Sequence, residues 1–129
     1  MKIPAELKYS KDHEWVKIEG NRVRVGITDY AQSQLGDVVF VELPAIDSSI
    51  AAGAGFSVVE SVKAVSDIYA PVRGVIVEVN EALADAPEVI NEDSYGEGWL
   101  VVIEMTDQAD LNQLLSSDEY KKLIESGGH

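Results

Sequence analysis

The 129 residues have the length of one ordinary domain, and 46% hydrophobic with 26% charged residues is typical of a globular protein. The formal net charge is −13, from 23 acidic against 10 basic side chains, so nucleic acid and anionic membranes are disfavoured as partners and basic protein faces are favoured. The sequence has no cysteine, which excludes disulfides, thiolate catalysis and cysteine-based zinc sites.

The N-terminal residues show no apolar run followed by a small-residue cleavage site, and no segment has membrane-spanning length. No linker or low-complexity tract divides the chain. We therefore expect a cytoplasmic monomer with a single domain over residues 1–126, followed by a disordered tail at 127–129.

Short runs rich in valine and isoleucine, separated by Gly, Pro, Asn or Asp, predict a series of β-strands. The runs are 14–19, 22–27, 38–43, 56–62, 65–72, 74–79 and 99–105. Gly20-Asn21 suits a tight hairpin between the first two strands, so Trp15, Val16 and Ile18 should pair with the second strand.

Helices are predicted between and after the strands. Residues 28–36 form one, with Thr28 as the cap and Gly36 at its end, and residues 80–87 form another, with Asn80 as the cap. Beyond residue 105, apolar residues at helical spacing predict two helices, or one broken near Ser116-Ser117. The fold class is mostly β, a barrel or sandwich with peripheral short helices and a C-terminal helical segment.

Few residues suggest catalysis or metal binding. The only histidines are His13, expected at the surface, and His129 in the tail, so a histidine triad or metal site is disfavoured. The loop 91–98 does not match the calcium-loop spacing, and no flanking helix pair is evident.

The stretch ESVKAVSD (60–67) is nearly symmetric about Lys63-Ala64. A two-residue connection there predicts that residues 62:65, 61:66, 60:67 and 59:68 lie opposite each other, with Glu60 and Asp67 on one face and Val59 and Ile68 on the other. Lys-Ala is a poor tight-turn pair, and opposed carboxylates repel. A surface lysine paired with two acids is the alternative, but the symmetry favours an accessible handle for covalent modification.

Several segments resemble the H proteins of the glycine cleavage system over nearly the whole chain. They are AELKYSKDHEWV (5–16), VGITDYAQSQLGDVVFVELP (25–44), ESVKAVSDIYAP (60–71), GVIVEVN (74–80) and APEVINEDSYGEGW (86–99). The resemblance implies a lipoyl/biotinyl-type barrel-sandwich hybrid and a non-catalytic carrier with lipoic acid in amide linkage on Lys63.

The resemblance also implies the partners. A pyridoxal-phosphate glycine decarboxylase would load an aminomethyl group, an aminomethyltransferase would pass its carbon to tetrahydrofolate, and an FAD-dependent dihydrolipoamide dehydrogenase would reoxidise the arm with NAD. A lipoyl ligase or transferase would modify Lys63, and we expect Glu60 and Asp67 to help it recognise the hairpin. We expect Glu14, with Asp67 as a second acid, to form the cleft that receives the cationic aminomethyl arm.

The sequence departs from the family at two loops, with Asp47 where glycine is usual and Ser94 where proline is usual. A biotin carrier is disfavoured because Val62 and Ala64, rather than methionines, flank the lysine. A lipoyl domain of a 2-oxoacid dehydrogenase would be shorter and joined to a catalytic domain by linkers. A lipoyl donor in relay to other enzymes, and an acidic scaffold with unmodified Lys63, remain alternatives.

Overall fold

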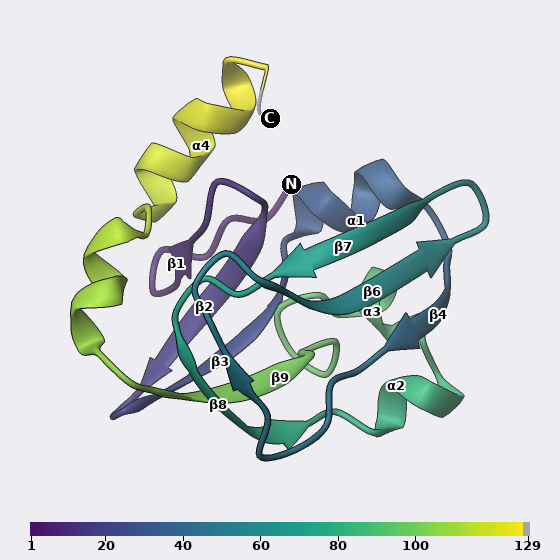
Figure 1. Ribbon diagram of the computed structural model, residues 1–129. Coiled ribbons are helices and arrows are strands. Elements are labelled where there is room, and N and C mark those ends of the chain that lie inside the picture. Colours follow the sequence, from purple (N-terminus) through teal and green to yellow (C-terminus); the bar gives the residue numbers. More distant parts are fainter. Residues whose placement is uncertain (128–129) are drawn as a thin grey trace.

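A computed structural model describes residues 1–127, in which two antiparallel β-sheets share one hydrophobic core and short helices lie around them (Figure 1). The mostly β architecture predicted from the sequence is confirmed. Of the predicted tail 127–129, residues 128 and 129 lie outside the described range. No helix within residues 1–127 is long and apolar enough to cross a membrane.

The larger sheet has six strands in the order β1-β2-β3-β9-β8-β5. Their bounds are Lys8–Tyr9, Glu14–Glu19, Arg22–Ile27, Val101–Met105, Gly74–Val79 and Ser49–Ile50. Gly20 has φ 68°, and the predicted pairing of Trp15, Val16 and Ile18 with β3 is confirmed. Trp15 lies directly opposite Gly26, where a Cβ atom would come within 2.6 Å of the indole nitrogen, so only glycine leaves room for the ring.

The smaller sheet consists of β4 (Val38–Glu42), β6 (Gly55–Ser61) and β7 (Val65–Tyr69), with β6 in the centre. The sequence predicted that β7 would continue to residue 72. It ends at Tyr69 instead, because Ala70 turns to donate to the Ala54 carbonyl and Pro71 has no N–H to donate to a strand. In Figure 1 the turn between β6 and β7 projects at one side of the molecule, far from the C-terminal helix.

Helix α1 (Asp29–Leu35) begins and ends as predicted. The Thr28 hydroxyl accepts a hydrogen bond from the Ala31 amide, and Gly36, at φ 80°, closes the helix by donating to the Gln32 carbonyl. The predicted break near Ser116-Ser117 is also confirmed, since a 3₁₀ helix η1 (Gln108–Gln113) precedes α4 (Ser117–Glu125). Ser116 and Glu119 form a reciprocal capping box at the start of α4.

The prediction that Asn80 caps the next helix was wrong. Helix α2 (Ala82–Asp85) is preceded by Glu81, whose side chain makes no capping bond. The buried Asn80 side chain instead donates to the carbonyls of Glu97, at 2.7 Å, and Trp99, at 2.8 Å. A short helix α3 (Val89–Glu92) follows α2, and Asn80 therefore anchors the loop between α3 and β9.

The core has two parts. The main cluster fills the space between the sheets with valine, isoleucine and leucine side chains, including Val16, Val25, Val59, Ile68 and Ile103. A second cluster lies beneath α4, where the rings of Tyr9 and Tyr120 stack with centroids 4.7 Å apart. Tyr120 is fully buried, and its hydroxyl lies 2.7 Å from the Thr28 hydroxyl, so this tyrosine attaches α4 to the sheet domain.

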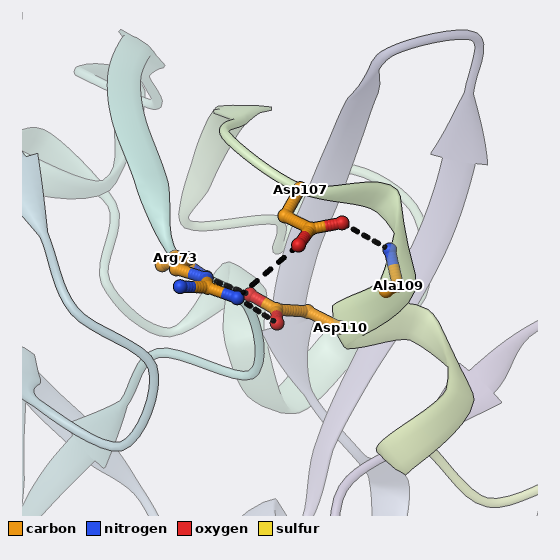
Figure 2. A network of polar contacts seen from close by, with 4 residues as sticks. All are labelled: Arg73, Asp107, Ala109 and Asp110. Atoms are coloured by element: carbon orange, nitrogen blue, oxygen red, sulfur yellow. Dashed lines mark hydrogen bonds and ion pairs between the residues drawn. The ribbon is translucent and has the colours of Figure 1, made fainter.

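Arg73, in the turn between β7 and β8, joins this turn to η1 (Figure 2). Its guanidinium donates to both carboxylate oxygens of Asp110 and to Asp107, which also caps η1 through the Ala109 amide. Arg73 is half exposed, so each pair adds only a modest stabilisation. Its charge is engaged within the fold.

Candidate functional site

The turn that carries Lys63 has a different register from the one predicted. Glu60 pairs with Val65, Val59 with Ser66, and Ser61 is joined to Ala64 by a backbone hydrogen bond of 2.8 Å. The predicted pairs 62:65, 61:66, 60:67 and 59:68 were therefore wrong, and Val62-Lys63, rather than Lys63-Ala64, are the central turn residues. The predicted faces hold, because each residue of β6 pairs with a β7 residue two positions away from the predicted one, and a shift of two residues leaves every side chain on the same face.

Ser61 explains why the turn closes one residue earlier. Its hydroxyl oxygen accepts from the backbone amides of Ala64, at 3.0 Å, and Lys63, at 3.3 Å. A serine side chain that accepts from amides two and three residues ahead stabilises a turn without asparagine or glycine at the tip. Lys63 thus stands exposed on an ordered turn.

Glu60 and Asp67 lie on the same outward face of the smaller sheet but are not opposite each other. Glu60 faces Val65, and Asp67 faces Val58. The predicted direct repulsion between the two carboxylates is thereby reduced to a diagonal one.

The turn is tied to the loop that follows α1. The Val62 amide donates to the Asp37 carbonyl at 3.0 Å, and the Lys63 side chain lies over Gly36, with its Cε 3.3 Å from where a Cβ atom would stand. Asn91 of α3 holds this loop by donating to the Gly36 carbonyl and accepting from the Val38 amide. Lys63 is thus a flexible side chain on a turn whose backbone is held by hydrogen bonds to the loop after α1.

A cavity of about 360 Å³ lies beside the turn. One wall is the hairpin, from Ala64 to Ile68, and the opposite wall is α1 with the loop before β2. The lining residues are Asp12, His13, Ile27, Tyr30, Ala31, Gln34, Leu35, Ala64, Val65, Ser66 and Ile68. Apolar side chains and a few polar groups, including one carboxylate, therefore adjoin Lys63.

Glu14 is not among the residues that line this cavity, although its chain neighbour His13 is. Glu14 is 1% exposed, accepting hydrogen bonds from the Ser10 hydroxyl and, at 3.3 Å, from the Tyr69 amide. Burial raises the pKa of Glu14 from its ordinary 4.5 to about 7, and these two bonds oppose the shift only in part. Asp67 is exposed on the other face of β7 from Ile68, so the fold does not bring Glu14 and Asp67 together.

His13 was predicted at the surface, and this was wrong. It is half buried, has φ 71°, and forms part of the cavity wall, with its Nδ1 2.8 Å from the Tyr120 hydroxyl and its ring against Tyr30. No group of three or more metal-ligating side chains occurs in the described part of the chain, including loop 91–98.

The sequence and the fold match known proteins along nearly the whole chain. The family model described as Glycine cleavage H-protein matches residues 7–127. The chain belongs to this family. A glycine cleavage system H protein of Carboxydothermus hydrogenoformans is 53% identical over 126 residues, covering 98% of this chain and 97% of that protein. One of Xanthomonas campestris pv. campestris (strain B100) is 57% identical over 128 residues, covering 98% of each.

A solved structure is also similar, namely the glycine cleavage system H protein from Mycobacterium marinum. Its TM-score is 0.87 at 43% identity, with 95% of this chain and 98% of that chain covered. The barrel-sandwich fold expected for an H protein is therefore confirmed.

The residues at the turn suit a lipoyl group. Lys63 offers an exposed amine, and no ion pair within residues 1–127 engages it. The apolar part of the adjacent cavity, with Ile27, Leu35 and Ile68, could take an aliphatic chain.

Sequence reasoning missed the cavity residues Asp12, Tyr30 and Gln34. Tyr30 and Gln34 are four apart and so share one face of α1, which helical spacing could have indicated. The sequence alone does not say which element that face meets.

Proposed function

We propose that this H protein carries lipoic acid in amide linkage on Lys63 and serves as the mobile carrier of the glycine cleavage system. Family membership gives the carrier role. The exposed Lys63 on its braced turn is the observation that supports the attachment site. A carrier needs a long arm on a rigid base, since the arm must reach partner active sites while the base fixes its origin.

Attachment of the arm requires an activated lipoyl donor. The Lys63 ammonium first gives up a proton, and the neutral amine then attacks the carbonyl of a lipoyl adenylate or thioester. The C–O or C–S bond breaks, AMP or the thiol leaves, and the attacking nitrogen loses a second proton as the amide forms. The amide is neutral, so the charge of the Lys63 ammonium is absent from the product.

The partners belong to the proposal as well. When bound, lipoate would supply a disulfide that is reduced as one sulfur accepts an aminomethyl group. Once that group has left, removal of two electrons and two protons from the dithiol would re-form the disulfide. We infer as partners a pyridoxal-phosphate glycine decarboxylase, a tetrahydrofolate-dependent aminomethyltransferase and an FAD-dependent dihydrolipoamide dehydrogenase that uses NAD. The chain would act as a cytoplasmic monomer.

The cavity beside Lys63 is the proposed shelter for the loaded arm. Asp12 in its wall offers a carboxylate to a cationic amine, and Glu14 is buried next to the lining residue His13. An incoming cation favours the ionised form of Glu14, whose pKa burial holds at about 7. Glu14→Ala should therefore hasten hydrolysis of the loaded arm, and an unchanged lifetime would remove Glu14 from the proposal. Asp67 stays a prediction as a second acid, although it does not line the cavity.

Intact mass spectrometry of the protein from a lipoate-replete host tests the attachment. We expect a lipoyl increment in the wild type and none in Lys63→Arg, which keeps the charge. An increment that persists in Lys63→Arg, or none in the wild type, would overturn the proposal. Glycine-dependent turnover with the three partner enzymes then separates a cleavage carrier from a donor in lipoyl relay.

A further inference from the structure

The outer face of the smaller sheet is a small grid of alternating apolar and acidic side chains next to the lysine turn. Across the three strands, Phe40 lies opposite Glu60, which lies opposite Val65. In the next row, away from the turn, Glu42, Val58 and Asp67 lie opposite one another in the same way. We call these six residues the outer grid.

The outer grid exposes large apolar side chains next to the lysine turn. Phe40 is 50% exposed and Val65 is 66% exposed, and Val62 at the turn extends the apolar area with 69% exposure. Exposed apolar side chains that gather in one place mark interaction sites more often than isolated ones do. Aromatic side chains, phenylalanine among them, are enriched at the centres of protein interfaces.

The charge around the outer grid has one sign. Between residues 25 and 72 the sequence contains six acids, namely Asp29, Asp37, Glu42, Asp47, Glu60 and Asp67, and Lys63 as the one base. No ion pair among residues 1–127 includes Glu42, Glu60 or Asp67. The ion pairs that do occur use Lys17, Arg22, Arg24 and Arg73, which belong to the larger sheet and the turn before β8. The three grid carboxylates are thus available to a basic partner.

We propose that the outer grid is the docking face for the enzyme that joins lipoate to Lys63, with Phe40 seated in an apolar recess and the three carboxylates facing basic side chains. This inference rests on the proposed function. It extends the predicted recognition by Glu60 and Asp67 to a surface with an apolar anchor.

Distance favours this partner over the enzymes of glycine cleavage. An enzyme that forms a bond to the Lys63 nitrogen must enclose the turn, so its surface necessarily meets the residues next to the turn. An enzyme that acts at the far end of the attached arm can stand off by the length of the arm. Glu60 and Val65 directly flank the turn, and Phe40 is the neighbour of Glu60 in the same row.

Lipoylation kinetics test the outer grid. Apo protein is incubated with purified lipoate ligase, lipoate and ATP, and amide formation is followed by intact mass. Phe40→Ser should raise KM for the apo protein about tenfold and leave kcat within about twofold, because an interface anchor contributes to binding. Phe40→Leu should retain most of the affinity, because an apolar side chain still fills the recess.

Ile18→Ser is the matched control. Ile18 is 45% exposed on β2, in the larger sheet, so it loses a similar apolar surface away from Lys63. We expect wild-type kinetics from it. Thermal unfolding of both serine variants shows whether Phe40→Ser is folded at the assay temperature. The variant with Glu42→Gln, Glu60→Gln and Asp67→Asn together should lose most of the salt dependence of KM, and Glu78→Gln on β8 should not.

Equal KM values for Phe40→Ser and Ile18→Ser would overturn the docking face. Normal lipoylation of Phe40→Ser with impaired turnover by the glycine cleavage enzymes would assign the face to those enzymes and also overturn the inference. A wild type that acquires no lipoyl group at Lys63 would instead refute the proposed function, and the docking face with it.

Discussion

The Asn91 side chain donates a hydrogen bond of 2.9 Å to the carbonyl of Gly36, and the Lys63 side chain lies over this glycine. Asn91 also donates to Gln32 of α1, at 2.9 Å, and accepts from the Val38 amide, at 2.8 Å. One side chain of α3 therefore joins the end of α1 to the start of β4, and this loop in turn holds the Val62 amide through Asp37.

Asn91→Ala should lower the free energy of unfolding by about 2–3 kcal/mol, because three partners lose their hydrogen bonds in a partly buried site. It should also slow lipoylation, since the loop beneath Lys63 is released. Denaturant unfolding and the ligase assay measure the two effects. Asn112→Ala, at an exposed residue of η1, is the matched control. It should change the free energy of unfolding by no more than about 0.5 kcal/mol and leave the lipoylation rate unchanged. A stable Asn91→Ala would show that the loop is held by other contacts.

Gly36→Ala should lower stability by about 1–3 kcal/mol, because φ 80° with ψ −159° is a backbone conformation that essentially only glycine adopts. Gly53→Ala is a close control, since Gly53 has φ 83° with open space around it. Both variants should lose stability by calorimetry. Gly36→Ala alone should alter the lipoylation rate, because its new methyl group meets the Lys63 side chain. Equal rates in the two variants would mean that this contact does not position the lysine.

Local signals predicted α1 and the β2–β3 hairpin well, whereas the lysine turn was misregistered. Thr28, Gly36 and Gly20 act within a few residues of themselves, so the sequence reveals them. The period-two alternation also grouped Val59 and Ile68 correctly on one face, and the structure shows that this face is buried. The register depends on whether Ser61 caps the turn, and a symmetric sequence such as ESVKAVSD fits either closure.

The surroundings of the lysine were harder to predict because they depend on tertiary packing. Glu14 appears as one more acid in an acidic chain, and only the approach of Tyr69 and Ser10 makes it buried. His13 lies in the cavity wall, where its ring contacts the hydroxyl of Tyr120 on α4, a residue 107 positions later in the sequence. No spacing in the sequence indicates these contacts.

Glu14 should make stability depend on pH. Its pKa is 4.5 in the unfolded chain and about 7 in the fold, so between these values the folded protein holds a proton that the unfolded chain has lost. The contribution of protonated Glu14 is therefore complete below about pH 4.5 and is lost as pH rises towards 7. The expected loss is on the order of 3 kcal/mol.

Glu14→Gln does not titrate and should remove this dependence. Its amide can still accept from Tyr69 and donate to Ser10, so the fold should persist. The difference in the free energy of unfolding between pH 5 and pH 8 should be smaller for Glu14→Gln than for the wild type. For Glu78→Gln, at an exposed residue, this difference should equal that of the wild type. Parallel pH profiles for wild type and Glu14→Gln would contradict the raised pKa.

Asp47 occupies a turn whose backbone conformation glycine adopts most easily. Its φ is 73°, in the left-handed region, and its amide donates to the Ile76 carbonyl at 2.8 Å. The turn thus keeps the geometry that glycine adopts, and aspartate tolerates this geometry better than most residues. Asp47→Ala should therefore lower stability by about 1 kcal/mol.

Asp47→Gly should leave stability within about 0.5 kcal/mol of the wild type, because relief of the backbone strain is offset by the greater freedom of glycine in the unfolded chain. Thermal unfolding of the two variants under identical conditions measures the difference. We expect Asp47→Gly to be more stable than Asp47→Ala. If the alanine variant is as stable as the glycine variant or more stable, the left-handed conformation at residue 47 does not strain a side chain.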